Sequence, residues 1–372
     1  MSSRSRPDRC LVFGITAHGL GHLTRACQLA NALAEIEPTL EFHFWTDFPP
    51  DRIASELKMA FHHRPIAYEP GTAQRSCFEL DSDQTVRDYQ AYISRREECL
   101  GVEREALQSI QCDAVICDVP ALLVRAASQA SIPAIAVSNF TWDWILEPIL
   151  EGTPAEPALG LLRDDYRSGV HHIRLPFGPS HSPFPSSEKG TMISRRAELS
   201  PAEVKTRLGL QRKEGNPLVL VCPGGWDPEG WQPIHTDTTD FDLILVGNLP
   251  VNCRAGDLNL PHNLPAPIRF PDLVNAADVV LAKPGYGITS ECVVHRTPLV
   301  TIDRPGFRET EILRQDLAKL GRSGEISLSD FFDGRWSPVL EQVLASSESW
   351  APLPDRPDRL VAQQVLSVLG RA

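Results

Sequence analysis

Short runs of apolar residues alternate along the chain with stretches whose apolar spacing is typical of helices. Eight runs predict strands: LVFGI (11–15), EFHFW (41–45), DAVICD (113–118), PAIAVS (133–138), LVLVC (218–222), DLILVG (242–247), DVVLA (278–282) and PLVTI (298–302). Most are almost continuously apolar, as are strands buried on both faces of a parallel sheet. Helices are predicted over 22–35, 84–109, 120–130, 287–295 and 309–320. This alternation predicts an α/β fold with doubly wound, Rossmann-like sheets.

The series is interrupted once, near the middle of the chain. Residues 176–187, PFGPSHSPFPSS, are rich in proline and serine and lack helical or strand periodicity, so we interpret them as a linker or an extended loop. A helix is expected soon after, because Ser200, Pro201 and Glu203 form a capping box with proline in the first turn. The domain organisation that we predict is a first Rossmann-like domain over 1–183, a second over 184–355 and a C-terminal helix over 356–372.

The composition is that of a globular protein, with 42% hydrophobic and 23% charged residues in a chain of 372. A net charge of -12 and the lack of a lysine or arginine run argue against nucleic acid as a partner. No segment reaches the roughly 18 apolar residues of a membrane span. The polar start, MSSRSRPDRC, precedes an apolar run too short for a signal peptide. We expect a cytoplasmic protein with no transmembrane segment, and peripheral membrane contact stays open.

The nine cysteines are scattered and form no C-x-x-C pair. Several, such as Cys117 and Cys222, lie in strand-like apolar runs, where buried free thiols are the usual case. The sequence therefore indicates neither a disulfide framework nor a zinc framework.

A glycine-rich turn links the first predicted strand to the first helix. The stretch AHGLGHLTR (17–25) places His18 and His22 beside Gly19 and Gly21. It lacks the full G-x-G-x-x-G spacing, and no acidic residue sits at a convincing ribose position after the second strand, which argues against a nicotinamide cofactor. Glycines let a ligand approach the backbone, and doubly wound sheets bind ligands at the carboxyl ends of their strands. His22 therefore suits proton abstraction, the alternative being a hydrogen bond within the turn.

A second glycine-rich turn, KPGYGITSE (283–291), follows a strand of the second half and opens a helix. Such a helix start binds anions through its backbone amides and dipole. The residues expected to present free backbone N–H groups there are Gly287, Ile288 and Thr289. The hydroxyl of Thr289 is a further donor.

Two charged side chains accompany this second turn. Glu291 lies one turn from the anion site, where a carboxylate accepts both hydroxyls of a ribose, and Lys283 is placed to neutralise phosphate. The alternative is structural: glycines for a tight turn, Glu291 as a partner of the helix dipole and Lys283 as a solvated strand end.

On these stretches the chain resembles the GT-B glycosyltransferases, near the class that contains the peptidoglycan N-acetylglucosaminyl transferase. It resembles still more the amino-terminal, glycosyltransferase-like half of plant L-arabinokinase. The resemblance covers nearly the whole chain and implies two Rossmann-like domains facing across a cleft, with the acceptor in the first and the nucleotide sugar in the second. The matching stretches are HGLGHLTR (18–25), DAVICDVP (113–120), VSNFTWDWI (137–145), HHIRLP (171–176) and KPGYGITSE (283–291).

The resemblance implies roles for residues of the first domain. The histidine that deprotonates the acceptor hydroxyl in many inverting members of the family falls on His22. An aspartate that orients this base in many small-molecule transferases falls on Asp118, where it would fix the imidazole tautomer. The alternative for Asp118 is a helix cap before Pro120. His18 is an additional histidine whose role stays open.

In the second domain the resemblance assigns the donor site. It implies contacts of Gly285, Gly287, Ile288 and Thr289 with the diphosphate, and of Glu291 with the ribose. The loop PGGWDP (223–228) places Gly224 and Gly225 beside the phosphates, and the stretch 303–311 matches the donor-sugar loop. Glu309 and Glu311 stand there in place of the amide side chains of the peptidoglycan enzyme, which leaves the sugar undetermined. No metal motif is recognised, and the family implies neither a metal ion nor a cofactor.

The sequence thus predicts a glycosyltransferase that moves a sugar from a nucleoside diphosphate donor, UDP-linked, to an acceptor hydroxyl, with inversion and without a metal. Two alternatives stay open. One is a nucleotide-sugar 2-epimerase, which Glu309 and Glu311 allow. The other is a regulatory module that binds a nucleotide sugar without turnover.

Overall fold

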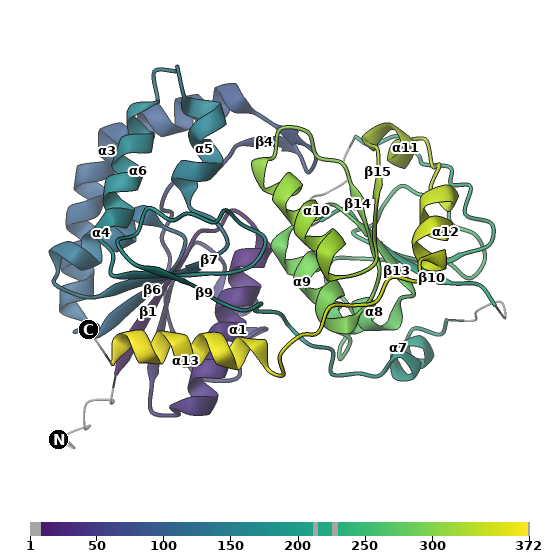
Figure 1. Ribbon diagram of the computed structural model, residues 1–372, viewed down its shortest axis with the longest axis horizontal. Coiled ribbons are helices and arrows are strands. Elements are labelled where there is room, and N and C mark those ends of the chain that lie inside the picture. The colour runs from purple at the N-terminus through teal and green to yellow at the C-terminus, as the bar shows by residue number, and fades with distance from the viewer. Residues whose placement is uncertain (1–8, 211–214, 225–229, 371–372) are drawn as a thin grey trace. The chain divides into compact units, whose positions relative to one another are not determined.

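The computed structural model describes residues 9–210, 215–224 and 230–370, which form two compact units (Figure 1). Unit 1 contains the residues up to 73, 81–193 and those from 354 on, and unit 2 contains 74–80 and 194–353. The boundary lies at 193/194 rather than at the expected 183/184, because strand β9 (Ser187–Lys189) still pairs with β8 (His171–Arg174) of unit 1.

Unit 1 is built on a seven-stranded sheet in the order β3-β2-β1-β6-β7-β8-β9, with parallel pairing throughout. The strands not yet given are β1 (Cys10–Ile15), β2 (Glu41–Trp45), β3 (His62–Arg64), β6 (Ala114–Asp118) and β7 (Ala134–Ser138). The strand order reverses between β1 and β6. Ligands of doubly wound sheets bind beyond the carboxyl ends of the strands at such a reversal.

The central strands of this sheet are buried along their whole length, as the apolar runs predict. β2 differs because it alternates. Phe42 and Phe44 are buried, whereas Glu41 and His43 are half-buried, so the alternate positions of β2 carry polar side chains.

Seven helices of the described residues belong to unit 1: α1 (Leu20–Ile36), α2 (Pro50–Ala54), α3 (Ser82–Ser109), α4 (Ala121–Gln129), α5 (Trp142–Leu150), α6 (Pro157–Arg167) and α13 (Pro357–Leu369). The last helix packs against the first (Figure 1). Gln28 Nε2 donates to Asp358 at 2.9 Å, and Arg356 donates to Glu35 at 2.7 Å. Unit 1 is therefore completed by residues from the far end of the chain.

Unit 2 has a six-stranded parallel sheet in the order β12-β11-β10-β13-β14-β15. Its strands are β10 (Leu218–Cys222), β11 (Asp242–Val246), β12 (Leu258–Leu260), β13 (Val279–Ala282), β14 (Leu299–Ile302) and β15 (Ser323–Ile326). Its helices are α7 (Pro201–Arg207), α8 (Phe270–Ala276), α9 (Tyr286–His295), α10 (Arg308–Leu320), α11 (Leu328–Phe332) and α12 (Ser337–Ala345). The order reverses between β10 and β13, so both units are doubly wound, as the sequence predicts.

A short hairpin from the first half of the chain belongs to unit 2. Its strands are β4 (Gln74–Ser76) and β5 (Glu79–Leu80), and Phe78 between them lies in the hydrophobic core of unit 2. The Phe78 ring stacks on Trp231, with 5.8 Å between ring centroids. Nothing in the sequence pattern predicts this insertion.

The proline- and serine-rich stretch 176–187 is a packed loop of unit 1 rather than a linker between units. Phe177 and Phe184 are buried, and Ser182 accepts a hydrogen bond from the Phe184 amide at 3.2 Å and bonds His172 at 2.8 Å. The capping box at Ser200 is present as predicted.

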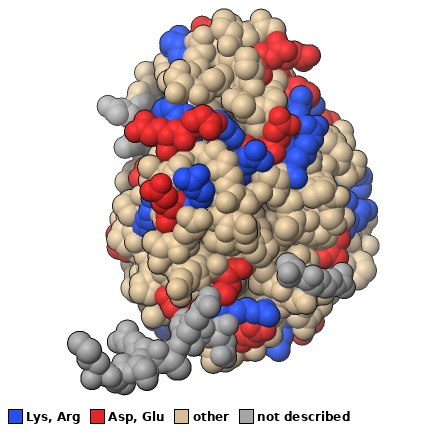
Figure 2. Space-filling view, turned by 90° about the vertical axis from the view of Figure 1, so that its left-hand side faces the viewer, with Lys and Arg blue, Asp and Glu red and all other residues tan. Residues whose placement is uncertain are grey.

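Positive and negative side chains are interspersed on the face shown in Figure 2, and neither sign forms a continuous stripe there. Among the described residues, no helix combines the length and the apolar character that crossing a bilayer requires.

A buried carboxylate in unit 1 gives the fold a pH dependence. Burial raises the pKa of Glu69 from 4.5 to about 7, although its Oε1 accepts a hydrogen bond from the Leu122 amide at 2.6 Å. The folded state therefore retains a proton that the unfolded chain has lost, so this group makes stability fall as pH rises between these two values. At about 1.4 kcal/mol per pKa unit, its cost above pH 7 is on the order of 3 kcal/mol.

We expect Glu69→Gln to remove this dependence, because glutamine keeps the acceptor for Leu122 without a charge. The free energies of unfolding of variant and parent should agree near pH 4 and differ by up to about 3 kcal/mol in favour of the variant at pH 8. Denaturant unfolding over this pH range measures the difference, with exposed Glu151→Gln as control. Parallel curves for Glu69→Gln and parent would show that Glu69 is charged at both pH values.

Candidate active site

The carboxyl ends of β1 and β6 bring the two predicted residues of unit 1 together. Gly19 precedes α1 in extended conformation, and His22 lies in the first turn, its amide bonded to the Gly19 carbonyl at 3.1 Å. Asp118 is the last residue of β6 and pairs in register with Ile15 at the end of β1. The parallel pairing of these strands thus sets Asp118 beside the start of α1, where His22 stands.

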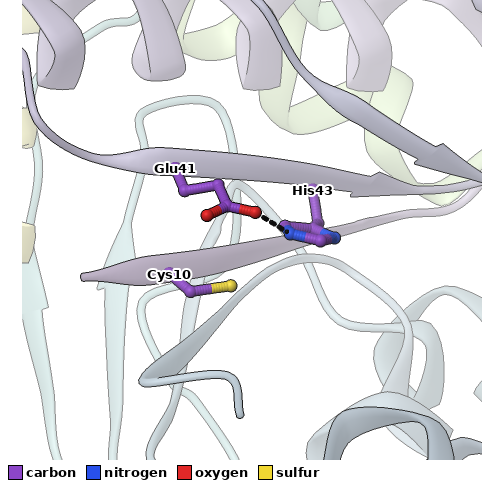
Figure 3. Close-up of side chains that lie close together, drawn as sticks. All are labelled: Cys10, Glu41 and His43. Atoms are coloured by element: carbon purple, nitrogen blue, oxygen red, sulfur yellow. Dashed lines mark hydrogen bonds and ion pairs between the residues drawn. The ribbon is translucent and has the colours of Figure 1, made fainter. Parts of the chain in front are cut away.

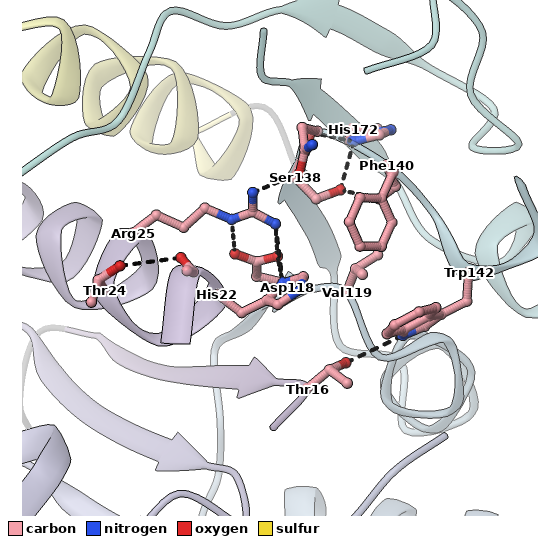
Figure 4. A network of polar contacts seen from close by, with 12 residues as sticks. Thr16, His22, Thr24, Arg25, Asp118, Val119, Ser138, Phe140, Trp142 and His172 are labelled. Carbon is pink, nitrogen blue, oxygen red and sulfur yellow. Dashed lines mark hydrogen bonds and ion pairs between the residues drawn. The ribbon is translucent and has the colours of Figure 1, made fainter. Parts of the chain in front are cut away.

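A buried network joins these two residues to Arg25 (Figure 4) and, through Arg25, to Asn139. His22 Nδ1 lies 2.9 Å from Asp118 Oδ1. Arg25 donates from Nη2 to Asp118 Oδ1 at 2.6 Å and from Nε to Asp118 Oδ2. Its Nη1 donates to Asn139 Oδ1 at 2.6 Å, and Asn139 in turn donates to the Phe177 carbonyl at 3.1 Å. Hydrogen bonds thus fix the side chains of Asp118, Arg25 and Asn139 in the network.

The electrostatics of the network keep Asp118 ionised. Burial alone would raise its pKa, but the adjacent Arg25 guanidinium and His22 imidazole bring the pKa below its ordinary value. An ionised carboxylate next to Nδ1 favours the tautomer that carries its proton on Nδ1, because that nitrogen then donates to Asp118. Nε2 is left as the nitrogen that can accept a proton.

Aromatic side chains surround the imidazoles. The Phe140 ring stands edge-on to His22, with 5.5 Å between centroids. His18 bonds the Thr72 hydroxyl at 3.0 Å and stands edge-on to the buried Trp142 at 5.2 Å. Gly71 permits this position: its φ is +71°, and a Cβ there would lie 2.6 Å from His18 Nδ1. His18 is therefore fixed by contacts of its own, separate from the His22–Asp118 pair.

In unit 2 the loops after β10 and β13 meet at Lys283. Gly224 has a φ of +116°, and a Cβ on it would lie 2.4 Å from Lys283 Cε. The glycine therefore leaves room for the half-buried lysine side chain. Gly225, the other glycine predicted for this loop, lies outside the described residues.

A second cation lies near Lys283. Burial together with the neighbouring Arg304 lowers the pKa of Lys283 to about 8, and burial lowers that of Arg304 to about 10. Arg304 donates from Nε to the Cys77 carbonyl at 2.8 Å, and its guanidinium lies 3.4 Å from the centroid of the Phe307 ring. The half-buried Glu309 offsets part of this positive charge. The half-buried Lys283 and the buried Arg304, so placed, favour the approach of an anion.

The predicted anion-binding helix is α9, and it begins at Tyr286, one residue before the predicted start at Gly287. Gly287 and Ile288 occupy its first turn, where backbone amides lack a carbonyl partner within the helix. The expectation of a free amide at Thr289 is wrong, because that amide donates to the Gly285 carbonyl at 3.1 Å. Its hydroxyl is buried and has no hydrogen-bond partner among the described residues. Thr289 can therefore offer a ligand its side chain only.

Glu291 lies in the second turn of α9 and is buried. Its Oε1 accepts a hydrogen bond from Arg195 Nε at 2.7 Å, a partner that the sequence pattern does not reveal. Glu309 and Glu311 lie in the first turn of α10. Glu311 is exposed and bonds Gln315 at 2.6 Å on its own helix.

Sequence reasoning missed Arg25, Asn139 and Arg304. The sequence could have indicated Arg25. It lies three residues after His22, and residues at this spacing lie on one face of a helix. Asn139 and Arg304 follow the carboxyl ends of β7 and β14, the edge of a doubly wound sheet that carries its binding residues. Neither has a motif of its own.

Comparison with known proteins relates this geometry to a fold. Among solved structures, a UDP-glucosyltransferase from Polygonum tinctorium superposes with a TM-score of 0.63 at 14% identity, covering 99% of this chain and 100% of that one. The chain has the GT-B fold. The fold is the one expected from the resemblance.

The relatives found by sequence match this chain over only part of their own length or of the chain. L-arabinokinase of Arabidopsis thaliana is 29% identical over 354 residues, which are 92% of the chain but only 33% of the plant protein. The chain thus spans a third of that relative. An uncharacterized glycosyltransferase of Methanopyrus kandleri is 23% identical over 66% of the chain and 72% of its own length. No protein-family model matches the chain.

Proposed function

We propose that the chain transfers a sugar from a UDP-linked donor to an acceptor hydroxyl, with inversion at the sugar carbon. The observation that carries this proposal is the His22–Asp118 pair, 2.9 Å apart and buried, at the strand-order reversal of unit 1. An alcohol is a weak nucleophile near neutral pH, so transfer needs a base within hydrogen-bond reach of the acceptor. Nε2 of His22 takes the acceptor proton, and Asp118 stabilises the imidazolium that forms.

The donor is assigned to unit 2. The diphosphate binds at the first turn of α9, near Gly285, Gly287 and Ile288, with the side chains of Thr289 and Lys283 as further donors. Arg304 adds a second positive charge, and the proposal therefore includes no metal ion for donor binding. The Glu291 carboxylate accepts hydrogen bonds from the ribose hydroxyls, while its Oε1 accepts one from Arg195. The UDP preference follows the Polygonum tinctorium relative, which is a UDP-glucosyltransferase.

A single assay tests the proposal and its alternatives. The protein is incubated with a panel of UDP-sugars, with and without sugar and lipid alcohols, and products are identified by mass spectrometry and NMR. A glycosylated acceptor with inverted configuration is the expected result. An epimer formed from donor alone would identify a nucleotide-sugar 2-epimerase. Donor binding without any product would identify a regulatory module, an arrangement that the partial match to L-arabinokinase allows.

Lys283→Ala is expected to weaken UDP binding about 10- to 100-fold, because a hydrogen bond to a charged group contributes roughly 1.5–3 kcal/mol. Calorimetry with UDP and with uridine locates the effect, since uridine lacks the diphosphate and should bind both proteins equally. The matched control is Lys319→Ala, which removes an exposed lysine of α10 that pairs with Asp316. Equal UDP affinities for Lys283→Ala and parent would remove Lys283 from the site.

A further inference from the structure

Three side chains with metal-binding atoms lie together at the amino ends of β1 and β2 (Figure 3). The Cys10 thiol, a Glu41 carboxylate oxygen and a ring nitrogen of His43 all lie within 4.8 Å of one another. The register explains the cluster. Cys10 pairs with Glu41, and His43 follows two residues later on the same face of β2. Strand pairing, rather than spacing in the sequence, brings these donors together.

We propose that this cluster binds one zinc ion, with the Cys10 thiolate, the His43 imidazole and the Glu41 carboxylate as ligands. Zinc binds these three donor types at about 2.0–2.3 Å in tetrahedral sites. Tetrahedral ligand atoms are then roughly 3.3–3.7 Å apart, which small side-chain rotations reach from the observed cluster. The thiolate and the carboxylate balance the two charges of the ion. Calcium and magnesium take oxygen ligands, so the thiol argues against both.

The fold holds the ligands in place before any ion arrives. The Cys10 amide donates to Asp113 Oδ2 at 2.7 Å, and the Cys10 carbonyl accepts from the Asp113 amide at 2.9 Å. Glu41 Oε1 lies 2.9 Å from His43 Nε2, so the carboxylate and the imidazole already meet. The exposed fraction increases from Cys10 to Glu41. Cys10 is 5% exposed, and the side chains of His43 and Glu41 are 13% and 34% exposed. An ion therefore has a path from solvent to the buried thiol.

A further imidazole stands beside the cluster on the neighbouring strand. His62 of β3 pairs in register with His43, and the two rings stack with 4.5 Å between centroids. Its Nε2 lies 3.2 Å from Glu41 Oε1, and its side chain is 65% exposed. His62 is the fourth ligand in the proposed site, which then ties β1, β2 and β3 together.

This site is separate from the proposed transfer chemistry. Cys10 begins β1 and Ile15 ends it, so the cluster and the His22–Asp118 pair lie at opposite ends of the strand, roughly 16–17 Å apart along it. The expected role is stabilisation of unit 1, because an ion that binds only the folded chain raises its stability.

Cobalt titration of the reduced protein tests the proposal directly. One equivalent of Co²⁺ should produce a thiolate-to-cobalt charge-transfer band and tetrahedral d–d bands, and Zn²⁺ should displace it. The thiol proton leaves to the buffer as the S–Co bond forms. Cys10→Ser should abolish the charge-transfer band, and Glu41→Gln should weaken binding at least about tenfold. The control is Cys253→Ser, which removes the exposed cysteine of unit 2 and should leave the band unchanged.

Three results would overturn the site. The first is the lack of a thiolate band at millimolar Co²⁺. The second is a band that survives in Cys10→Ser or disappears in Cys253→Ser. The thiol of Cys112 forms a hydrogen bond with that of Cys10. The third result is therefore a Cys10–Cys112 disulfide, seen as a loss of two hydrogens by mass spectrometry, in protein purified under reducing conditions. Glu41→Gln keeps the experiment decisive if Cys10→Ser does not fold, because Glu41 is half-buried and its replacement leaves the strand intact.

Discussion

Replacing His22 by alanine is expected to lower turnover by about 10²–10⁴-fold, the usual contribution of a general base. The physical reason is the position of the imidazole, whose Nδ1 faces Asp118 and whose Nε2 is left to accept the acceptor proton. UDP affinity should stay within about twofold of the parent, because the proposed donor residues belong to unit 2. Steady-state kinetics with saturating donor, together with calorimetry, separates the two quantities.

Two companion variants sharpen this test. Asp118→Asn should lower turnover in the same direction, because an amide neither fixes the tautomer nor stabilises the imidazolium. His18→Ala should have a milder effect, because His18 is held by Thr72 and Trp142 rather than by Asp118. Full activity of His22→Ala would show that another group takes the proton.

Arg25→Ala is expected to destabilise unit 1 by about 3–5 kcal/mol, the usual cost of leaving one partner of a buried ion pair unpaired. The guanidinium donates to both oxygens of Asp118 and to Asn139. Without it, the buried Asp118 carboxylate keeps the hydrogen bond to His22 but loses both bonds to Arg25. Denaturant unfolding measures the loss. The double variant Arg25→Ala/Asp118→Asn should lose much less than the sum of its parts, because the buried charge is gone.

Arg25 is also expected to act as a positioning residue, and a matched pair isolates this role. Arg96 and Asp165 form another buried ion pair of unit 1, away from the His22 network. Arg96→Ala should cost similar stability and leave kcat at saturating donor unchanged. Arg25→Ala should lower kcat as well, because Asp118, and through it the His22 ring, is then held by fewer hydrogen bonds. Equal kcat values for the two variants would assign Arg25 a structural role only.

The apolar pattern was sufficient for most of the fold. All eight predicted strands are present, and the reversal of strand order follows from the doubly wound class that their alternation indicates. The pattern could not show the hairpin at 74–80, because strands of two or three residues have no measurable period and the burial of Phe78 depends on unit 2. For 176–187 the pattern left a linker and an extended loop open, and the structure shows the loop. The pattern could not decide because the burial of Phe177 and Phe184 depends on tertiary contacts.

For the site, sequence reasoning reached the residues that carry motifs and missed those that act through contacts. Asp118 ends β6 and His22 lies in the first turn of the helix after β1, and the structure brings them together. Asn139 in unit 1 and Arg304 in unit 2 each follow a strand at the carboxyl edge of their own sheet, a position that no local motif reveals. The Cys10 cluster was missed for the same reason. The spacing of the cysteines does not indicate that Glu41 and His43 of β2 lie beside Cys10 of β1. Register, which links residues across strands, is the information that the linear pattern lacks.

The contact between α1 and α13 has a consequence for how the chain folds during synthesis. Gln28 and Asp358, which bond across these helices, are 330 residues apart, and unit 2 is synthesised between them. Amino-terminal domains usually fold first on the ribosome, while the rest of the chain is still being made. In this chain unit 1 cannot be completed until α13 has been synthesised. The face of α1 that packs against α13 therefore stays unburied while unit 2 is being made.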